Sequence, residues 1–392
     1  MSAGFVLAVS VFHLFVNGQE VPVLESAPVD EGYAKAYGRE MQGYSPSRYS
    51  YAAFEVPQGR KSRVSVRWPG GATNFVASVP FVKSFEPLGR DNALVLVGEE
   101  SERTKVNRDD PTVRYFGPGR YHEDIVLKSG ETLYLARGAW VEGSLRGMGD
   151  NIRVCGRGVI SGVEGGKKQL ARFKGRNIDI NGITLFGSKA WTLILDGVEN
   201  CTVDGIKIVG GVIVCDDGID MMGVKNVRIR NSFIRNVDDC LAFKYSAENV
   251  SVSNCTFWDD MGCVIRIGYE CLPPPAAFRD IRIKDCEVLH FARMGRAPTQ
   301  YWASAMLMIQ MAREQVAEDI SFENIRYHDA PRPDDNHIIL KTMPITEGFD
   351  FKEPGHIRCI TFRNVAGRCD ERPNVYRSEH DSKHRIQQIV ME

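Results

Sequence analysis

The stretch from Val214 to Glu270 reads VCDDGIDMMGVKNVRIRNSFIRNVDDCLAFKYSAENVSVSNCTFWDDMGCVIRIGYE. It holds two acidic clusters, at 216–220 and 238–239, and each cluster is followed by a short apolar run. Ionised groups packed closely together repel and shift each other's pKa, so carboxylates between core-forming strands need an explanation. The clusters lie about one repeat of the surrounding sequence apart. On neighbouring turns of a solenoid they would therefore lie on one face.

A repeat that starts at residue 151 surrounds this stretch. Each copy opens mostly with Asn or Asp and continues with alternating apolar and polar residues, which is the period of a strand. The early copies recur every 23–26 residues or so. The copies begin at Asn151, Asn177, Asn200, Asn226, Asn249, Asp280, Asp319 and Cys359.

The position six places into each copy is small or apolar, as stacking requires. It is occupied by Ile183, Ile206, Ser232, Cys255, Cys286 and Ile325. A strand of this kind cannot bury its apolar side alone, whereas stacked copies close one continuous core. No helical period separates the strands, so we predict a right-handed parallel β-helix (solenoid) over 104–392.

The first 103 residues carry no repeat. They contain short alternating runs at 13–16, 51–56, 63–68, 74–79 and 93–97, separated by turn signals such as Asn17-Gly18. Many short strands with such punctuation favour a small β-sandwich domain over 1–103, which makes the whole chain all-β. The apolar run 4–12 lacks the flanks of a signal peptide, so we interpret it as a strand.

Composition excludes several function classes. The formal net charge is −1, so we expect neither nucleic acid nor a membrane surface as a partner. No run of 18 apolar residues predicts a membrane-spanning helix. The ten cysteines form no CxxC pair, so we expect buried free thiols, no metal and no cofactor. This cysteine usage favours a cytoplasmic protein, with secretion as the alternative.

Three carboxylates stand out as candidate catalytic groups, namely Asp217, Asp238 and Asp239. Hydrolysis of an acetal between sugars needs one acid to protonate the leaving oxygen and one base to activate water. Aspartates on adjacent coils, about 4.8 Å apart along the stack, suit such a pair. The alternative is that Asp-Gly and Asp-Asp occupy turns for their own hydrogen bonds.

Four successive segments, 187–193, 215–220, 237–244 and 262–270, resemble the motifs of the polygalacturonase family and of its clan relatives, the dextranases and isopullulanase. The resemblance implies a parallel β-helix that cleaves glycosidic bonds of a poly- or oligosaccharide with inversion. It implies Asp238 as the general acid, with Asp217 and Asp239 activating water.

The chain departs from the polygalacturonase pattern in two places. Gly262-Cys263-Val264 stands where that family has Gly-His-Gly, and no convincing Arg-x-Lys follows downstream. Both departures favour the dextranase-like branch, in which three aspartates act without that histidine. A carbohydrate is therefore the expected substrate.

Further residues are candidates for binding the sugar. Charged side chains on the same predicted face could bind hydroxyls or a uronate, and aromatic rings could stack on sugar C–H faces. A solvated face and core packing are the respective alternatives. The inserted segment 291–317 is expected to lie over the binding face. The candidates are Lys244, Arg266, Glu270, Trp258, Tyr269, Tyr301 and Trp302.

Two functions from other classes remain open. One is a β-helix lyase or epimerase on uronate polymers, which would release unsaturated products or change a sugar centre. The other is a carbohydrate-binding solenoid without catalysis. The intact aspartate trio argues against the binder, and the lack of a lysine- or arginine-rich groove argues against the lyase.

Overall fold

The computed structural model describes residues 13–28, 49–55, 64–67, 75–78, 93–99, 102, 104–164, 169–210, 215–291, 298–300, 303–328, 336–346, 349–367 and 371–392. Every named element in these ranges is a β-strand, and they hold no helix long and apolar enough to cross a membrane. The chain forms two compact units, Met1–Lys105 and Val106–Glu392.

The first unit contains a three-stranded sheet, β2-β1-β5, and a four-stranded sheet, β3-β4-β7-β6. The predicted Asn17-Gly18 hairpin is confirmed, because both residues have positive φ and β1 pairs antiparallel with β2. All five predicted strands are present. Their packing as a sandwich stays a prediction. The strand predicted over 4–12 lies outside the described residues. The strands are β1 (His13–Val16), β2 (Gln19–Val21), β3 (Val23–Pro28), β4 (Tyr49–Glu55), β5 (Val64–Arg67), β6 (Phe75–Ser78) and β7 (Ala93–Glu99).

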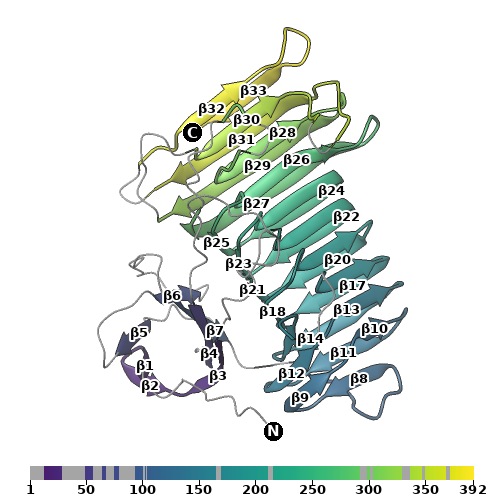
Figure 1. The fold of residues 1–392 in the computed structure, drawn as a ribbon, viewed down its shortest axis with the longest axis vertical. Coiled ribbons are helices and arrows are strands. Elements are labelled where there is room, and N and C mark those ends of the chain that lie inside the picture. The colour runs from purple at the N-terminus through teal and green to yellow at the C-terminus, as the bar shows by residue number, and fades with distance from the viewer. Residues whose placement is uncertain are drawn as a thin grey trace. The chain divides into compact units, whose positions relative to one another are not determined.

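The second unit is a parallel sheet wound into a helix, with its strands stacked in chain order from β8 to β33 (Figure 1). The predicted parallel β-helix is confirmed. Its strands are β8 (Val113–Phe116), β9 (Gly119–His122), β10 (Ile125–Leu127), β11 (Thr132–Leu135), β12 (Ala139–Glu142), β13 (Leu145–Met148), β14 (Arg153–Gly156), β15 (Val159–Ser161), β16 (Ala171–Lys174), β17 (Arg176–Asn181), β18 (Thr184–Phe186), β19 (Leu193–Asp196), β20 (Glu199–Asp204), β21 (Lys207–Val209), β22 (Ile219–Arg230), β23 (Phe233–Asn236), β24 (Leu241–Ser253), β25 (Thr256–Asp259), β26 (Ile265–Cys271), β27 (Ala277–His290), β28 (Leu307–Met311), β29 (Val316–Tyr327), β30 (Ile338–Thr342), β31 (His356–Ala366), β32 (Val375–Ser378) and β33 (Ile386–Met391).

Each coil has three faces, which we number in chain order. Face 1 stacks β19, the first part of β22, the first part of β24, β26, β28, β30 and β32. Face 2 stacks β20, the later parts of β22 and β24, then β27, β29, β31 and β33. Face 3 stacks β18, β21, β23, β25 and the end of β27. Each face 3 strand leads into face 1 of the next coil.

The asparagines that open the repeat copies build a ladder along the corner between face 1 and face 2. Asn226 donates from Nδ2 to Oδ1 of Asn200 (2.9 Å), and Asn249 donates in the same way to Asn226 (2.7 Å). These residues have φ between 54° and 59°, a left-handed conformation that asparagine tolerates better than most residues. The repeat therefore begins with Asn because this corner requires both that backbone and that side chain.

The apolar positions of the repeat fill the interior of the coils. The predicted column six places into each copy, from Ile183 to Ile325, is buried throughout. Nine cysteines lie in the described residues; none is in a disulfide and seven are buried, as predicted. Apolar side chains repeated coil upon coil thus form one continuous core, which holds the corners in register.

Replacing Asn226 by Ala is expected to lower the free energy of unfolding by about 1–3 kcal/mol, because alanine disfavours the left-handed backbone and cannot carry the ladder. Glycine adopts the left-handed backbone without strain, so Asn226→Gly removes only the side-chain hydrogen bonds and should lower the free energy of unfolding by less than Asn226→Ala does. Denaturant unfolding followed by circular dichroism measures both. Equal losses would show that the backbone conformation contributes nothing.

Candidate active site

The two acidic clusters lie at one corner of the helix, where face 3 of a coil leads into face 1 of the next. Asp217 lies in the turn before β22, and Asp238 and Asp239 lie in the turn before β24. The Gly218 N–H donates to the carbonyl of Asp239 (2.8 Å), so the two turns stack directly on each other. The structure thus brings the three predicted aspartates together on adjacent coils.

Lys244 sits at the centre of a buried charge cluster on face 1. Its ammonium lies 2.7 Å from carboxylate oxygens of both Asp217 and Asp220, and 3.4 Å from Glu270. It also lies 3.7 Å from the ring centroid of Trp191, a cation–π distance. Burial alone would lower the pKa of Lys244, but the three carboxylates raise it well above its ordinary value. The lysine therefore carries its charge inside the site.

Burial also acts on the carboxylates around Lys244. Asp220 is fully buried, and this burial raises its pKa well above the ordinary value despite the charge of Lys244. Burial raises the pKa of Glu270 as well. The cluster therefore holds more carboxyl groups than cations, and those buried most deeply resist ionisation.

Asp239 is fixed from two sides. Its Oδ2 accepts from Nε of Arg266 (2.6 Å), and its Oδ1 accepts from the backbone N–H of Cys263 (2.7 Å). The Cys263 side chain is itself buried and contacts Met308, so the backbone at position 263 serves the site and the thiol does not. Arg266 and Lys244 thus each hold one of the predicted water-activating aspartates.

Asp238 is the least constrained carboxyl group of the three. It is half-buried, and its Oδ1 accepts from the backbone N–H of Asp239 (3.1 Å). Burial raises the pKa of Asp238 well above its ordinary value, and the charges of Asp217 and Asp239 raise it further. A carboxyl group in this position tends to keep its proton, which suits a general acid.

Three residues of the site were not assigned by sequence reasoning. Asp216 is buried and accepts from the backbone N–H groups of Val237 (2.7 Å) and Asp238 (3.2 Å), so it ties the turn of one coil to the next. Asp220 and Trp191 enclose Lys244. Only the alternation of side chains along a strand pointed to Asp220. Asp220 pairs with Ala242, and Lys244 is two residues further along β24, so both side chains lie on the same side of face 1.

The predicted aromatic contacts have different surroundings. Trp258 is buried; its Nε1–H donates to Asp260 (2.8 Å) and its ring packs against His290, which are the contacts of a packed side chain. Tyr269 is half-buried, with the Arg266 guanidinium 5.6 Å from its ring centroid. A sugar contact at either ring stays a prediction. Tyr301 and Trp302 lie outside the described residues.

Within the inserted segment, β28 continues face 1, and residues 303–305 lie over that face beyond Arg266. The carbonyl of Ala303 accepts from Nη2 of Arg266 (3.4 Å), and the hydroxyl of Ser304 donates to the carbonyl of Met261 (2.6 Å). Ala303 and Ala305 pack on the outward side chains of β28 and β30 in a small apolar cluster. This segment therefore borders the aspartates on one side.

Comparisons with known proteins agree with this fold. Dex49A from Penicillium minioluteum superposes with a TM-score of 0.60 at 13% identity, covering 97% of this chain and 93% of that one. A family 28 exopolygalacturonase from Yersinia enterocolitica gives 0.54 at 13% identity, covering 97% and 86%. At these identities the likeness shows the fold alone, a right-handed parallel β-helix.

Sequence comparison identifies the family. A 78-residue segment is 33% identical to an exopolygalacturonase of Arabidopsis thaliana, but it spans only 20% of this chain and 18% of that protein. Residues 164–378, more than half of the chain and including all three aspartates, match glycosyl hydrolases family 28. The chain belongs to glycosyl hydrolases family 28.

Proposed function

We propose that this protein is a glycosidase that hydrolyses glycosidic bonds of a poly- or oligosaccharide with inversion. The single observation that carries the proposal is the arrangement of a half-buried carboxyl group, Asp238, beside two carboxylates held by cations, where burial and the two negative charges raise the pKa of Asp238. Membership of the family supports the hydrolysis of glycosidic bonds in a polysaccharide. The assignment of each aspartate rests on the contacts within the site.

Asp238 acts as the general acid. Protonation of the leaving oxygen requires a group that is still protonated at the working pH, and a raised pKa provides it. Its side chain makes no ion pair with Lys244 or Arg266 in the described contacts, so its proton is not displaced by a cation. Transfer of that proton to the glycosidic oxygen breaks the bond to the anomeric carbon.

Asp217 and Asp239 activate the water. Each has one carboxylate oxygen engaged by a cation, Lys244 or Arg266, and the second oxygen of Asp239 accepts from the Cys263 N–H, so both groups are held in a fixed orientation. An inverting enzyme needs room for water between acid and base, with about 6.5–9.5 Å between the two carboxyl groups. Stacking of coils about 4.8 Å apart is compatible with such a separation once the side chains diverge.

We propose a neutral sugar as the substrate, as the resemblance to the dextranase-like branch implies. Lys244 and Arg266, the cations beside the aspartates, are both committed to carboxylates of the protein. The neighbouring outward positions on β28 are Met308 and Gln310, which are buried and uncharged. A uronate carboxylate would have to compete with aspartates for its counter-ions.

The proposal is tested by incubating the full chain with α-glucans, galacturonans and arabinans and detecting new reducing ends. Proton NMR of the first product then reports its anomeric configuration, and inversion is expected. A product with retained configuration would contradict the mechanism. Unsaturated products that absorb ultraviolet light would show that the protein is a lyase and not a hydrolase.

Gly262→Ala is expected to lower turnover by about 10–100-fold, because catalytic groups tolerate little displacement. A Cβ there would lie 2.6 Å from the carbonyl carbon of Asp238 and 2.8 Å from its Oδ1. The control is Gly197→Ala, where a Cβ meets nothing within 4 Å and only the left-handed backbone is strained. Steady-state kinetics compare the two; equal turnover would show that the Asp238 turn can shift without consequence.

A further inference from the structure

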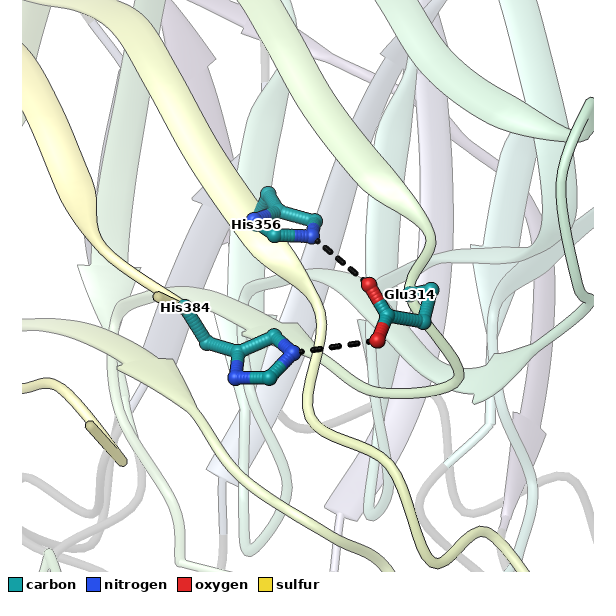
Figure 2. A group of neighbouring side chains, drawn as sticks. All are labelled: Glu314, His356 and His384. Atoms are coloured by element: carbon teal, nitrogen blue, oxygen red, sulfur yellow. Dashed lines mark hydrogen bonds and ion pairs between the residues drawn. The ribbon is translucent and has the colours of Figure 1, made fainter. Parts of the chain in front are cut away.

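A second group of functional side chains lies at the far end of the helix, at the corner between face 1 and face 2. Glu314 lies between β28 and β29, His356 opens β31, and His384 precedes β33, so the three belong to successive coils. Figure 2 shows both imidazole rings directed at the Glu314 carboxylate. Nε2 of His356 lies 3.1 Å from Oε2, and Nε2 of His384 lies 3.2 Å from Oε1.

The main chain around Glu314 is shaped to present this carboxylate. Arg313 and Glu314 both have φ of 58°, a left-handed conformation that costs a residue with a side chain roughly 1–2 kcal/mol. The Glu314 N–H donates to the carbonyl of Pro354 (2.7 Å), which holds the turn against the next coil. Gly355 makes this approach possible, because a Cβ there would lie 2.6 Å from the carbonyl oxygen of Gln315. Strained backbone of this kind gathers at functional sites.

The separations fit a zinc ion. Two ligand atoms on tetrahedral zinc, with bonds of about 2.0–2.1 Å, lie roughly 3.3–3.4 Å apart. The two observed nitrogen–oxygen distances, each to a different oxygen of Glu314, are close to that value, and one ligand atom from each of the three residues falls within 4.8 Å of the others. Calcium and magnesium prefer sites made of oxygen alone, whereas two imidazoles with a carboxylate suit zinc.

His384 also has the support that metal-binding histidines usually have. Its Nδ1 lies 2.9 Å from both carboxylate oxygens of Asp381, so in a metal complex Nδ1 would carry the hydrogen and Nε2, on the Glu314 side, would be the ligand atom. A carboxylate behind a ligating histidine fixes the tautomer and makes the ligand more basic. Lys383 competes for Glu314, at 2.9 Å from Oε1, but its side chain is 70% exposed and free to turn away.

We propose that Glu314, His356 and His384 bind one divalent transition metal ion, best satisfied by zinc, with water completing the coordination. The ion joins the last three coils and stabilises this end of the helix. This site is independent of the proposed hydrolysis. No metal was expected from the sequence, because the cysteines form no CxxC pair. These three ligands also lack a short spacing, since His356 lies 42 residues and His384 70 residues beyond Glu314.

The test is to strip the full chain with a chelator and titrate it with Zn²⁺ alone in a calorimeter. One equivalent per chain should bind, and saturation should raise the melting temperature by about 2–5 °C. Co²⁺ bound at the same site should give visible absorption bands typical of a four- or five-coordinate ion. A wild-type chain that binds no zinc stoichiometrically would overturn the proposal.

Variants locate the ion. Glu314→Gln and His384→Ala should abolish stoichiometric binding, and Asp381→Asn should weaken it about 10–100-fold. His380→Ala removes an exposed histidine from the same loop and is the matched control, with binding unchanged. Circular dichroism without metal checks that each variant is folded. Zinc binding that survives both Glu314→Gln and His384→Ala would place the ion elsewhere.

Discussion

Turnover by the Asp238→Asn variant is expected to fall by about 10²–10⁴-fold, the usual contribution of a general acid, with the fold unchanged. The amide has the shape of the carboxyl group, and its oxygen can still accept from the backbone N–H of Asp239, which now bonds Asp238 at 3.1 Å. It cannot give up a proton to the leaving oxygen. Initial rates on the best polysaccharide from the substrate screen measure the loss.

The choice of substrate separates loss of the acid from a general disturbance. A glycoside whose leaving group is a phenol of low pKa needs little protonation, so Asp238→Asn should recover most of its activity on it. Asp217→Asn and Asp239→Asn should not recover, because they lack the group that activates water. Asp319→Asn, the same change at an exposed position of β29, is the control. Wild-type turnover by Asp238→Asn would refute the acid role.

Ionisation of Asp238 should also produce the alkaline limb in the pH profile of turnover. Burial and the charges of Asp217 and Asp239 raise the pKa of Asp238, and the group is active only while protonated. Turnover should therefore fall as the pH rises through that raised pKa. The residual activity of Asp238→Asn should lack this limb in a plot of kcat/KM against pH. A limb that persists at the same pH would belong to another group.

The fold was predictable because its local rules repeat along the chain. Asn200, Asn226 and Asn249 combine a left-handed corner with a side-chain ladder, and both demands appear in sequence as one residue type at regular spacing. The alternation after each asparagine encodes which side chains enter the core. By contrast, no repeat governs the packing of the first unit, so its predicted sandwich rests only on short alternating runs and the turn signals between them.

The aspartates of the site were predictable for a related reason, since a motif one coil long places them on adjacent turns. Their partners were harder to see. Asp220 meets Lys244 only through the register of β22 and β24, and Trp258 resembles a sugar-stacking residue until its burial is known. Glu314 and His356 come together through coils of unequal length, which leave no fixed spacing to recognise.

Lys244→Met is expected to lower the free energy of unfolding by about 3–5 kcal/mol at neutral pH, the range for removing one partner of a buried ion pair. The ammonium lies 2.7 Å from both Asp217 and Asp220, and only 3% of the lysine is exposed. Methionine keeps a similar unbranched stem beside Trp191, so the loss is electrostatic. Denaturant unfolding at several pH values measures it.

The pH dependence identifies the cause. Without Lys244, the pKa values of Asp220 and Glu270, which burial already raises, should rise further, so the folded chain holds protons that the unfolded chain releases above about pH 4. The stability of the variant should then decline as the pH rises from about 4 to 7, by up to about 1.4 kcal/mol per pH unit for each retained proton. The control is Lys225→Met, whose half-exposed ammonium lies 3.4 Å from Glu248; it should change stability by less than about 1 kcal/mol, without that slope. A loss for Lys244→Met no larger than the control's would mean that the buried ion pairs add nothing net to folding.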